Sequence, residues 1–517
     1  MWVCQEMPKS YLNNQSNPTQ TRKSYMISRE FKVSSIAAVA LLAACGGGGG
    51  TVSVAPSTEP ALAAAKGFLA KLDVLRSSAP TSSSAYLALS DGCYLADGRS
   101  KAYIAADFDA DPLAVASRQF EIGSTHTAPQ VVAERSSANA DGSTRREIDI
   151  KYVINYKDGT KNETAEETLV SGSSSGAKLA DASTCATPDS KTDWRLYGNR
   201  KVVQTSVTAG NERIERTALS TGLPLTPVMF YSKYILLGVS DPAKVATYAT
   251  VTGPGLGRIP LGTPGPLTLL SPRVLRSDPE LAGRPGNAVD LLDTDSFRLC
   301  SHGGTGSAPA YTANCAAGGG GGFTWGFSSI SGATVDTVFA NLNIKAGDVY
   351  TIKVYNDDGW KTVDGQVGKT PIATYTSTLA ALPFTAAVLA GTGPETDLFA
   401  RITSSSKTPA EIATAIRTKA AISTELTWKA PGPMPDGRAL ALSHNWSIEL
   451  GQANSTGANW PGSGKTNYSY PGSLATSTTL NTPAPVAALV VPTYAETTLH
   501  YVNRNGNFLY SRYVYQQ

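Results

Sequence analysis

Three aspartates at alternate positions are the first residues whose chemistry the sequence suggests. Asp107, Asp109 and Asp111 lie in the segment DFDADP. Carboxylates at this spacing in a loop can wrap their oxygens around a calcium ion. Pro112 stands where a calcium-binding loop has its turn glycine, and Arg118 stands where the closing glutamate would be. The segment is therefore interpreted mainly as an exposed acidic loop, with a calcium site as the alternative.

Two glycine-rich segments match catalytic motifs only in part. GSSSG, residues 172–176, has the spacing of a nucleophile elbow with Ser174 as the nucleophile, but no firm helix is expected after it. GSGKT, residues 462–466, matches the end of a phosphate-binding loop, but Asn459 replaces the first glycine of that motif. Both segments are interpreted as surface loops, and the sequence does not indicate an enzyme.

Aromatic side chains offer another kind of site, because flat apolar rings with polar edges suit the faces of sugars. Of the 22 tyrosines and 7 tryptophans in the chain, most are expected in the core. The candidates for a surface that binds glycan are Trp428, Trp446, Trp460 and Tyr494.

The clearest functional signal is an apolar run, residues 33–42, that ends just before Cys45. Arg29 and Lys32 precede the run, and this order of charged, apolar and small residues is typical of a secretory signal. The run is too short to cross a bilayer, which takes about 20 apolar residues. Residues 1–44 are thus a signal region, and translation is expected to begin at Met26 because the residues before it fit no part of such a signal.

The four residues Leu42-Ala43-Ala44-Cys45 resemble the lipobox of bacterial lipoproteins. The resemblance implies that the sulfur of Cys45 is diacylated, that this residue begins the mature chain, and that the lipid holds the protein at the membrane. Gly46 stands where lipoproteins retained in the inner membrane often have Asp, which favours the outer membrane. Residues 45–57 are expected to form a flexible lipidated tether, since the run of glycines after Cys45 favours a coil.

The net charge limits which classes of partner are expected, and the cysteine content indicates the cellular compartment. The formal net charge of +3 comes entirely from five basic and two acidic residues before Cys45, so the mature chain is neutral and no nucleic-acid partner is expected. Four cysteines follow the anchor, and an even number in an exported chain favours disulfides. Of the three possible pairings, we favour Cys93 with Cys185 and Cys300 with Cys315, because each pair then lies within one expected domain.

The pattern of apolar residues predicts a β-rich multidomain chain. A helical spacing from Leu62 to Leu75, capped by Ser57 or Thr58, precedes alternating segments in an α+β domain over residues 58–215, with a helix on a bent antiparallel sheet. Short strands then predict an antiparallel β-sandwich-like region, divided into residues 222–403 and 408–517. One helix is expected within it, because Thr408 and Glu411 have the spacing of a capping box. Hairpins are expected at Asp158-Gly159 and at Asn505-Gly506.

The alternating stretch that begins at Asp193 contains the motif W-x-L-Y-G-N, in which Gly198 offers a place for a bulge that bends the strand. With this strand, the order of elements is similar to the cystatin-like cone of NTF2-like domains. That resemblance implies a pocket for a small ligand in the N-terminal domain. It also implies Asp and His in the pocket of enzymatic members, a pattern that His126 alone does not match.

Three functions follow from these observations. The first is a lipid-anchored envelope lipoprotein that binds or scaffolds an envelope glycan or protein. The second is an envelope hydrolase that acts on glycan or ester, and the third is a carrier of a small ligand in the N-terminal domain.

Overall fold

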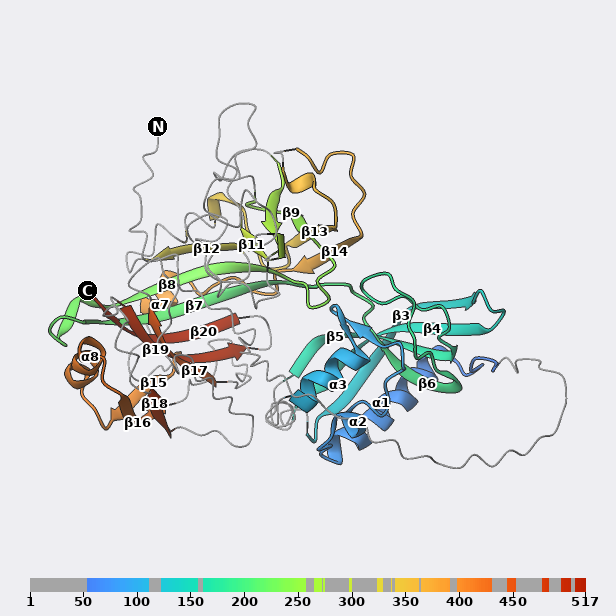
Figure 1. Cartoon of the computed structure of the whole chain (residues 1–517), viewed down its shortest axis with the longest axis horizontal. Coiled ribbons are helices and arrows are strands. Elements are labelled where there is room, and N and C mark those ends of the chain that lie inside the picture. Colours follow the sequence, from blue (N-terminus) through green and yellow to red (C-terminus); the bar gives the residue numbers. More distant parts are fainter. Residues whose placement is uncertain are drawn as a thin grey trace, which may run out of the picture.

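The computed structural model describes residues 54–110, 122–156, 161–256, 265–271, 273–274, 297–299, 323–328, 336, 340–361, 364–390, 398–429, 444–451, 477–482, 494–503 and 507–517. These residues form a first unit with helices on one side of a sheet, and a second unit built from three sheets (Figure 1). The prediction of an α+β N-terminal part followed by a β-sandwich-like region is confirmed. Within the residues described, no helix has the length and apolar character needed to cross a membrane.

The first unit has an antiparallel sheet in the order β3-β4-β5-β6, which follows the sequence. Its elements are α1 (Ala61–Ser77), α2 (Ser83–Tyr86), β1 (Leu95–Ala96), β2 (Arg99–Ser100), α3 (Lys101–Ala110), β3 (Thr125–Ala138), β4 (Thr144–Asn155), β5 (Lys161–Ser173) and β6 (Ser190–Gly198).

Helix α1 lies on one face of this sheet because each element has one apolar face, and the two faces bury each other. Phe68 and Leu69 of α1 pack with Ile148 and Ile150 of β4 in one buried cluster. The predicted cap of α1 is wrong, since Pro60 occupies the N-cap position and no side chain caps the helix. Proline is tolerated at the start of a helix because its fixed φ is compatible with the first turn and its missing N–H is not needed there.

Gly198 produces the predicted bulge at the end of β6. The register between β5 and β6 shifts at this point, and Gly198 has a φ of +82°. A Cβ here would lie 2.1 Å from the carbonyl oxygen of Leu95, so only glycine fits without movement. The bulge ends the first sheet, and the next strand belongs to the second unit.

The second unit has a six-stranded, a five-stranded and a three-stranded sheet, in the orders β12-β8-β7-β20-β19-β17, β11-β10-β9-β13-β14 and β15-β16-β18. All neighbours are antiparallel except β20 and β7, which are parallel. The strands are β7 (Gln204–Ala218), β8 (Pro224–Ser240), β9 (Tyr248–Thr252), β10 (Leu267–Leu270), β11 (Arg298–Leu299), β12 (Phe323–Ser328), β13 (Val349–Tyr355), β14 (Ala373–Thr378), β15 (Arg401–Ser405), β16 (Ile422–Lys429), β17 (His444–Gly451), β18 (Ser477–Thr482), β19 (Tyr494–Asn503) and β20 (Asn507–Gln516). The helices are η4 (Gly359–Lys361), α7 (Ala386–Ala390) and α8 (Pro409–Thr418).

The long strand β8 contributes to two hydrophobic cores, and β7 pairs with it along its length. Val207 of β7 and Leu237 of β8 pack with Ile352 of the five-stranded sheet, whereas Tyr231 of β8 packs in a second cluster with Trp428 of the three-stranded sheet. A strand of 15 residues spans about 50 Å at roughly 3.4 Å per residue, which is long enough to cross both cores. The six-stranded sheet therefore holds the two smaller sheets together.

Buried polar residues on β7 and β8 also lie in this sheet. Asn211 accepts a hydrogen bond from the backbone N–H of Phe384 at 2.8 Å, and Lys233 pairs with Asp336. Burial lowers the pKa of Lys233 to about 8. Lys233 also donates to the carbonyl oxygen of Phe384 at 3.2 Å, so both strands fasten the segment before α7 to the sheet.

Several local predictions are confirmed. Thr408 and Glu411 form the expected capping box at the start of α8. The strands β4 and β5 pair as a hairpin, and so do β19 and β20, whose connecting turns lie outside the described residues.

The sheet boundaries differ from the expected domain boundaries. The change from the first unit to the second falls between Gly198 and Gln204, whereas residues 216–222 contain the turn between β7 and β8. The second expected boundary, at residues 403–408, falls inside the three-stranded sheet, because β15 pairs with β16. Hairpin turns and domain linkers share the same glycine- and proline-rich composition, which explains the difference.

Candidate functional sites

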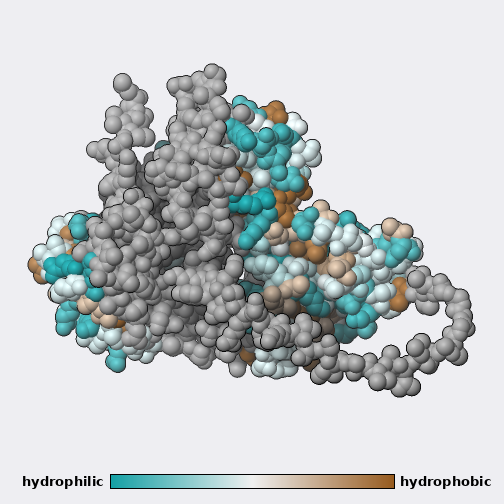
Figure 2. Space-filling view, viewed as in Figure 1, coloured by the Kyte–Doolittle hydropathy of each residue, from teal (hydrophilic) through white to brown (hydrophobic). Residues whose placement is uncertain are grey.

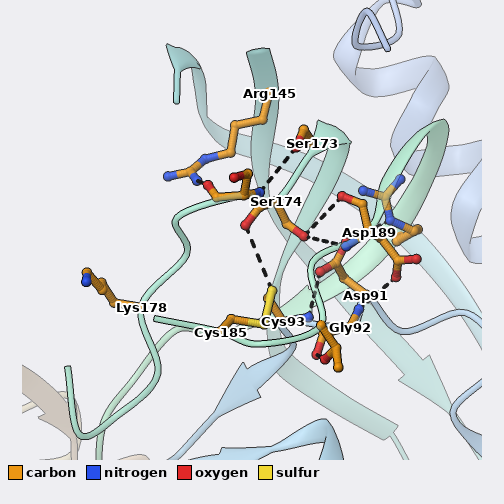
Figure 3. Close-up of a disulfide and its surroundings, with 12 residues drawn as sticks. Asp91, Gly92, Cys93, Arg145, Ser173, Ser174, Lys178, Cys185 and Asp189 are labelled. Carbon is orange, nitrogen blue, oxygen red and sulfur yellow. Dashed lines mark hydrogen bonds and ion pairs between the residues drawn. A yellow bond between two sulfur atoms is a disulfide. The ribbon is translucent and has the colours of Figure 1, made fainter. Parts of the chain in front are cut away.

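A disulfide fastens one end of the first unit. Cys93 and Cys185 are bonded, as predicted, and join segments 92 residues apart. Both lie in a small buried cluster with Val170 and Tyr197, on the face of the sheet opposite α1 (Figure 3). The other predicted pair, Cys300 and Cys315, lies outside the described residues, as does Cys45.

A buried ion pair lies beside the disulfide. Nε of Arg195 is 2.8 Å from Oδ2 of Asp91, and the two side chains are 6% and 0% exposed. The other carboxylate oxygen of Asp91 accepts the backbone N–H of Cys93 at 2.7 Å. Arg195 also donates to the carbonyl oxygens of Gly172, Lys191 and Asp193. Each charge therefore has the hydrogen-bond partners that burial requires.

Ser174 is a structural residue and not an exposed nucleophile. It is fully buried, and its hydroxyl contacts only the backbone of Asp189, accepting from the N–H at 2.9 Å and donating to the carbonyl oxygen at 3.3 Å (Figure 3). A serine nucleophile needs a base within hydrogen-bond reach, and among the described residues the hydroxyl of Ser174 is bonded to backbone groups instead. The interpretation of GSSSG as a loop is supported by the turn that follows Ser174.

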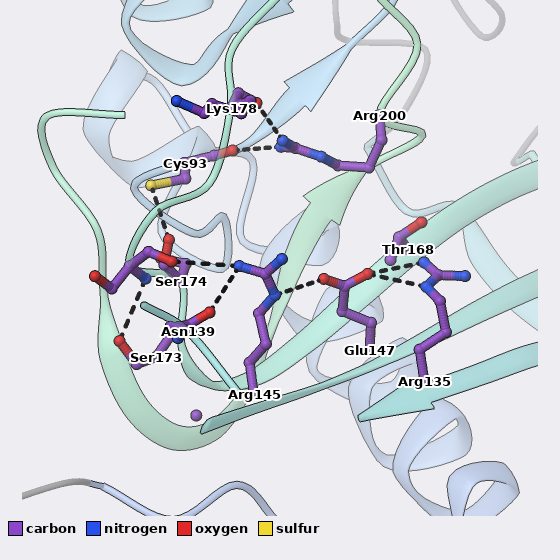
Figure 4. A network of polar contacts seen from close by, with 12 residues as sticks. Cys93, Arg135, Asn139, Arg145, Glu147, Thr168, Ser173, Ser174, Lys178 and Arg200 are labelled. Atoms are coloured by element: carbon purple, nitrogen blue, oxygen red, sulfur yellow. Dashed lines mark hydrogen bonds and ion pairs between the residues drawn. The ribbon is translucent and has the colours of Figure 1, made fainter. Parts of the chain in front are cut away.

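Charged side chains pair with one another on the same face of the sheet. Glu147 lies between Arg135 and Arg145, with ion pairs of 2.8 Å to each (Figure 4). Although burial opposes ionisation of Asp149, hydrogen bonds from Arg135 and Thr168 hold its pKa below the usual value. The same bond with Asp149 raises the pKa of Arg135. This face of the first unit thus satisfies its own charges.

Glu167 on β5 is an ionisable group that the sequence pattern did not reveal. Its Oε2 atom is buried and has no hydrogen-bond partner in the part of the chain that the structure describes. Burial of the carboxyl group and, to a smaller extent, the negative charge of Asp97 raise its pKa to about 8, and the positive charge of Arg76 opposes the shift. At neutral pH this carboxyl group is therefore mostly protonated and can donate a hydrogen bond.

The single histidine of the first unit pairs with an aspartate. Nδ1 of His126 is 2.5 Å from Oδ1 of Asp73, which also accepts the backbone N–H of His126 at 3.0 Å. The imidazole is 4% exposed and lies near the ring of Tyr152. Both bonds to Asp73 join the start of β3 to α1, so the pair has a structural role in positioning that strand.

The end of the expected tether is bound to the first unit, which corrects the prediction that residues 45–57 are all flexible. We call residues 54–59 the clip. Ala55 accepts a hydrogen bond from Oγ1 of Thr192 at 3.1 Å, and the N–H of Ser57 donates to Oγ of Ser171 at 2.7 Å. Nη1 of Arg146 donates to the carbonyl oxygens of Ser57 and Glu59.

The predicted calcium ligands do not form the expected loop. Asp107 and Asp109 lie in helix α3, and Asp111 lies outside the described residues. Side chains two residues apart on a helix point in directions about 200° apart, so these two carboxylates do not converge. Oδ1 of Asp109 instead accepts a hydrogen bond from Ser83 at 2.9 Å. Among the described residues, no group of three or more His, Cys, Asp or Glu could hold a metal ion.

The predicted aromatic surface is not supported at the one position whose side chain is described. Trp428 is 2% exposed and belongs to the core beneath the three-stranded sheet, so its assignment as a surface ligand residue is wrong. Trp446 and Tyr494 lie in β17 and β19, but their side chains are outside the described residues, as is all of Trp460.

Apolar side chains are scattered over the described surface. Val74, Val132, Leu223 and Val367 are each more than half exposed, yet they come from different elements. On the face shown in Figure 2, hydrophilic and apolar residues are mixed over the first unit. Single exposed apolar residues are normal on soluble proteins and do not identify a binding site.

Comparison with known proteins gives no family. No protein-family model matches the chain, and no curated protein matches its sequence. Three solved structures are similar over much of the chain. The first is from work on host-cell-surface retention of a 1.5-MDa bacterial ice-binding adhesin, with 9% identity, coverage of 72% of this chain and 90% of that one, and a TM-score of 0.13.

The second is a Ca²⁺-stabilised adhesin of an Antarctic bacterium that binds ice, with 8% identity, coverage of 76% and 74%, and a TM-score of 0.13. The third is a tetra-tandem repeat from the extending region of a large adhesion protein, with 9% identity, coverage of 75% and 67%, and a TM-score of 0.13. At these TM-scores the likeness carries no argument about fold or function.

Proposed function

We propose that this chain is an exported protein, held at the outer membrane by lipid on Cys45, that binds or scaffolds an envelope component. The observation that carries the exported location is the Cys93–Cys185 disulfide, because such bonds persist in oxidising compartments. The signal-like segment before Cys45 gives the same compartment independently.

The binding or scaffolding role rests on the kind of architecture described above. The long strand β8, which contributes to two cores, gives a rigid body, and Glu147 pairs with Arg135 and Arg145 within the first unit. Rigid β-sheet scaffolds commonly carry binding residues on their loops. The ligand class we propose is an envelope glycan or protein.

Labelling with radioactive palmitate tests the anchor. We expect incorporation in the full chain, loss of it in Cys45→Ser, and no change in Cys300→Ser, which removes a cysteine that lies after the proposed anchor. Equal incorporation in the wild-type chain and Cys45→Ser would show that the anchor is elsewhere.

A thermal-shift panel with peptidoglycan fragments and envelope polysaccharides tests the glycan role. A ligand present at 100 times its Kd adds about 2.7 kcal/mol of stability, which raises Tm by a few degrees. A shift with one glycan class supports glycan binding. If no glycan shifts Tm, the glycan role is wrong, and crosslinking in the intact envelope then tests the protein partner.

A small-ligand carrier is a second candidate, and Glu167 is the observation that favours it. A buried, mostly protonated carboxyl group with a free Oε2 atom can donate a hydrogen bond to a carbonyl oxygen of a ligand. The helix on a bent sheet also fits the proposed NTF2-like assignment.

Native mass spectrometry of the purified full chain tests this second role. We expect a bound small molecule that is lost in Glu167→Leu, which removes the hydrogen-bond donor, and kept in Glu166→Leu. Glu166 is the matched control because it is the neighbouring residue, is 51% exposed and pairs with Lys151. Retention of the molecule in both variants, or no molecule in the wild-type chain, would contradict the carrier role.

A further inference from the structure

The clip, residues 54–59, fixes where the chain leaves the first unit toward Cys45. Its hydrogen bonds go to Thr192 at the start of β6, to Ser171 near the end of β5 and to Arg146 near the start of β4. All three positions lie at the same end of the antiparallel sheet. Pro56 also packs close to Gly172, where an added Cβ would be 3.2 Å away. The exit point is therefore fixed to one end of the first unit.

The second unit is attached at the opposite end of the same sheet. Strand β6 has 9 residues, starts beside the clip and ends at Gly198, after which the chain enters β7. At about 3.3 Å per residue, roughly 30 Å separates the clip from this junction. Figure 1 shows the same order, with the blue start of the described chain at the end of the first unit that lies away from the second.

Strand β7 extends the molecule further in the second unit. It begins close to the junction, since Val202 donates its N–H to the hydroxyl of Tyr375 on β14 at 2.8 Å. Its 15 residues carry the chain about 50 Å to the turn between β7 and β8. That turn, which contains the exposed Leu223, lies far from the clip.

The segment between the anchor and the clip is short. Only residues 46–53 separate Cys45 from the clip, and a chain of this length reaches about 30 Å when fully extended and about 15 Å on average if glycine-rich. Binding of residues 54–57 thus removes four residues from the expected tether. An acyl chain on Cys45 would keep the clip end close to the bilayer.

We propose that the clip end of the first unit faces the phospholipid headgroups and that the second unit projects away from the membrane. The exposed residues at this end carry both signs of charge, with Asp141 in the turn between β3 and β4 and Lys191 at the start of β6. Hydrogen bonds from Ser143 hold the pKa of Asp141 near 2, so this carboxylate stays charged. Such a mixed surface fits a zwitterionic headgroup layer and not insertion into the acyl chains.

This orientation rests on the proposed lipid anchor, so the experiment measures the anchor and the orientation separately. The lipidated full chain is bound to vesicles of phosphatidylethanolamine and phosphatidylglycerol, and flotation of the vesicles shows whether the anchor holds it. A photo-crosslinking phenylalanine derivative then replaces either Asp141 or Leu223, and mass spectrometry measures crosslinks to lipid.

Because a short linker sets a high local concentration at one end only, we expect at least about fivefold more lipid crosslinking at position 141 than at position 223. Equal crosslinking, or more at position 223, in a chain that floats would overturn the orientation and leave the anchor intact. A chain that does not float would overturn the anchor and the orientation together.

Two further variants test the cause of the orientation. A long Gly-Ser insertion after Gly50 leaves both units unchanged and is expected to reduce crosslinking at position 141 several-fold. Thr192→Val combined with Ser171→Ala removes two of the clip bonds and should act in the same direction. Unchanged crosslinking in the insertion variant would show that the tether does not set the orientation.

Discussion

Asp91 and Arg195, which are 104 residues apart in the sequence, form a buried ion pair with an Nε–Oδ2 distance of 2.8 Å. The pair joins the segment before β1 to strand β6, two residues from the Cys93 half of the disulfide. The disulfide and the ion pair therefore fasten the same segment to the sheet, one through a covalent bond and one through charge. This end of the first unit is expected to be its most stable part.

Removal of the disulfide should destabilise the first unit. The bond closes a loop of 92 residues, which corresponds to about 4 to 5 kcal/mol on the chain-entropy model. We expect Cys93→Ala combined with Cys185→Ala to lower the free energy of opening of β5 and β6, measured by hydrogen exchange on the full chain. The Cys45→Ser variant is the control, and equal exchange in the double variant and the control would contradict a stabilising role.

Gly198 should tolerate no side chain. An alanine there would combine a positive φ with a Cβ 2.1 Å from the carbonyl oxygen of Leu95. Gly142 is a matched control, because its φ is +80° but nothing lies within 4 Å of an added Cβ. We expect Gly142→Ala to cost about 1 kcal/mol and Gly198→Ala clearly more, as measured by urea unfolding. Equal costs would mean that the close approach to Leu95 is unimportant.

Trp428 should act as a core residue. Truncation of a buried tryptophan typically costs about 3 to 5 kcal/mol, so Trp428→Ala should lower Tm of the second unit by several degrees. Val367→Ala, at a position 74% exposed, should have little effect. If Trp428→Ala kept the wild-type Tm but lost binding to an envelope glycan, the tryptophan would be a ligand residue after all.

Glu167 should make the first unit less stable at high pH. Its pKa is about 8 in the folded chain and near 4.5 in an ordinary setting, so the folded state binds this proton more tightly than the unfolded state. The stabilisation is therefore complete below about pH 4.5 and is lost as the pH rises through about 8.

The variant Glu167→Gln cannot ionise and should escape this loss. Hydrogen exchange of the β5 backbone at pH 6 and pH 9, corrected for intrinsic exchange, measures the effect. We expect Glu167→Gln to be more stable than the wild-type chain at pH 9, with a smaller difference at pH 6, and Glu166→Gln to follow the wild type. A Glu167→Gln profile parallel to that of the wild type would show that Glu167 does not titrate in this range.

Local signals in the sequence predicted most of the elements. The capping box at Thr408 and the alternation of apolar and polar residues around Ile148 depend on residues a few positions apart. Such patterns can be recognised in the sequence without knowledge of the fold. The sequence also predicted the disulfide between Cys93 and Cys185, because these two cysteines lie in the same expected domain, residues 58–215.

The errors came from features that depend on distant contacts. The turn at residues 219–222 has the composition of a linker, but β7 and β8 pair across it. Ser57 binds Ser171, which lies 114 residues further along the chain. The burial of the Glu167 carboxyl group depends on the side chains that pack around β5. No local pattern records such contacts, so the clip and the protonated carboxyl appear only in the folded chain.

Mass spectrometry of the N-terminal peptide, from protein purified out of isolated outer membranes, tests the central claim most directly. The proposed anchor predicts a peptide that begins at Cys45 and carries the mass of a diacylglyceryl group on its sulfur. A peptide that extends upstream of Cys45, or one with an unmodified thiol at this residue, would contradict it.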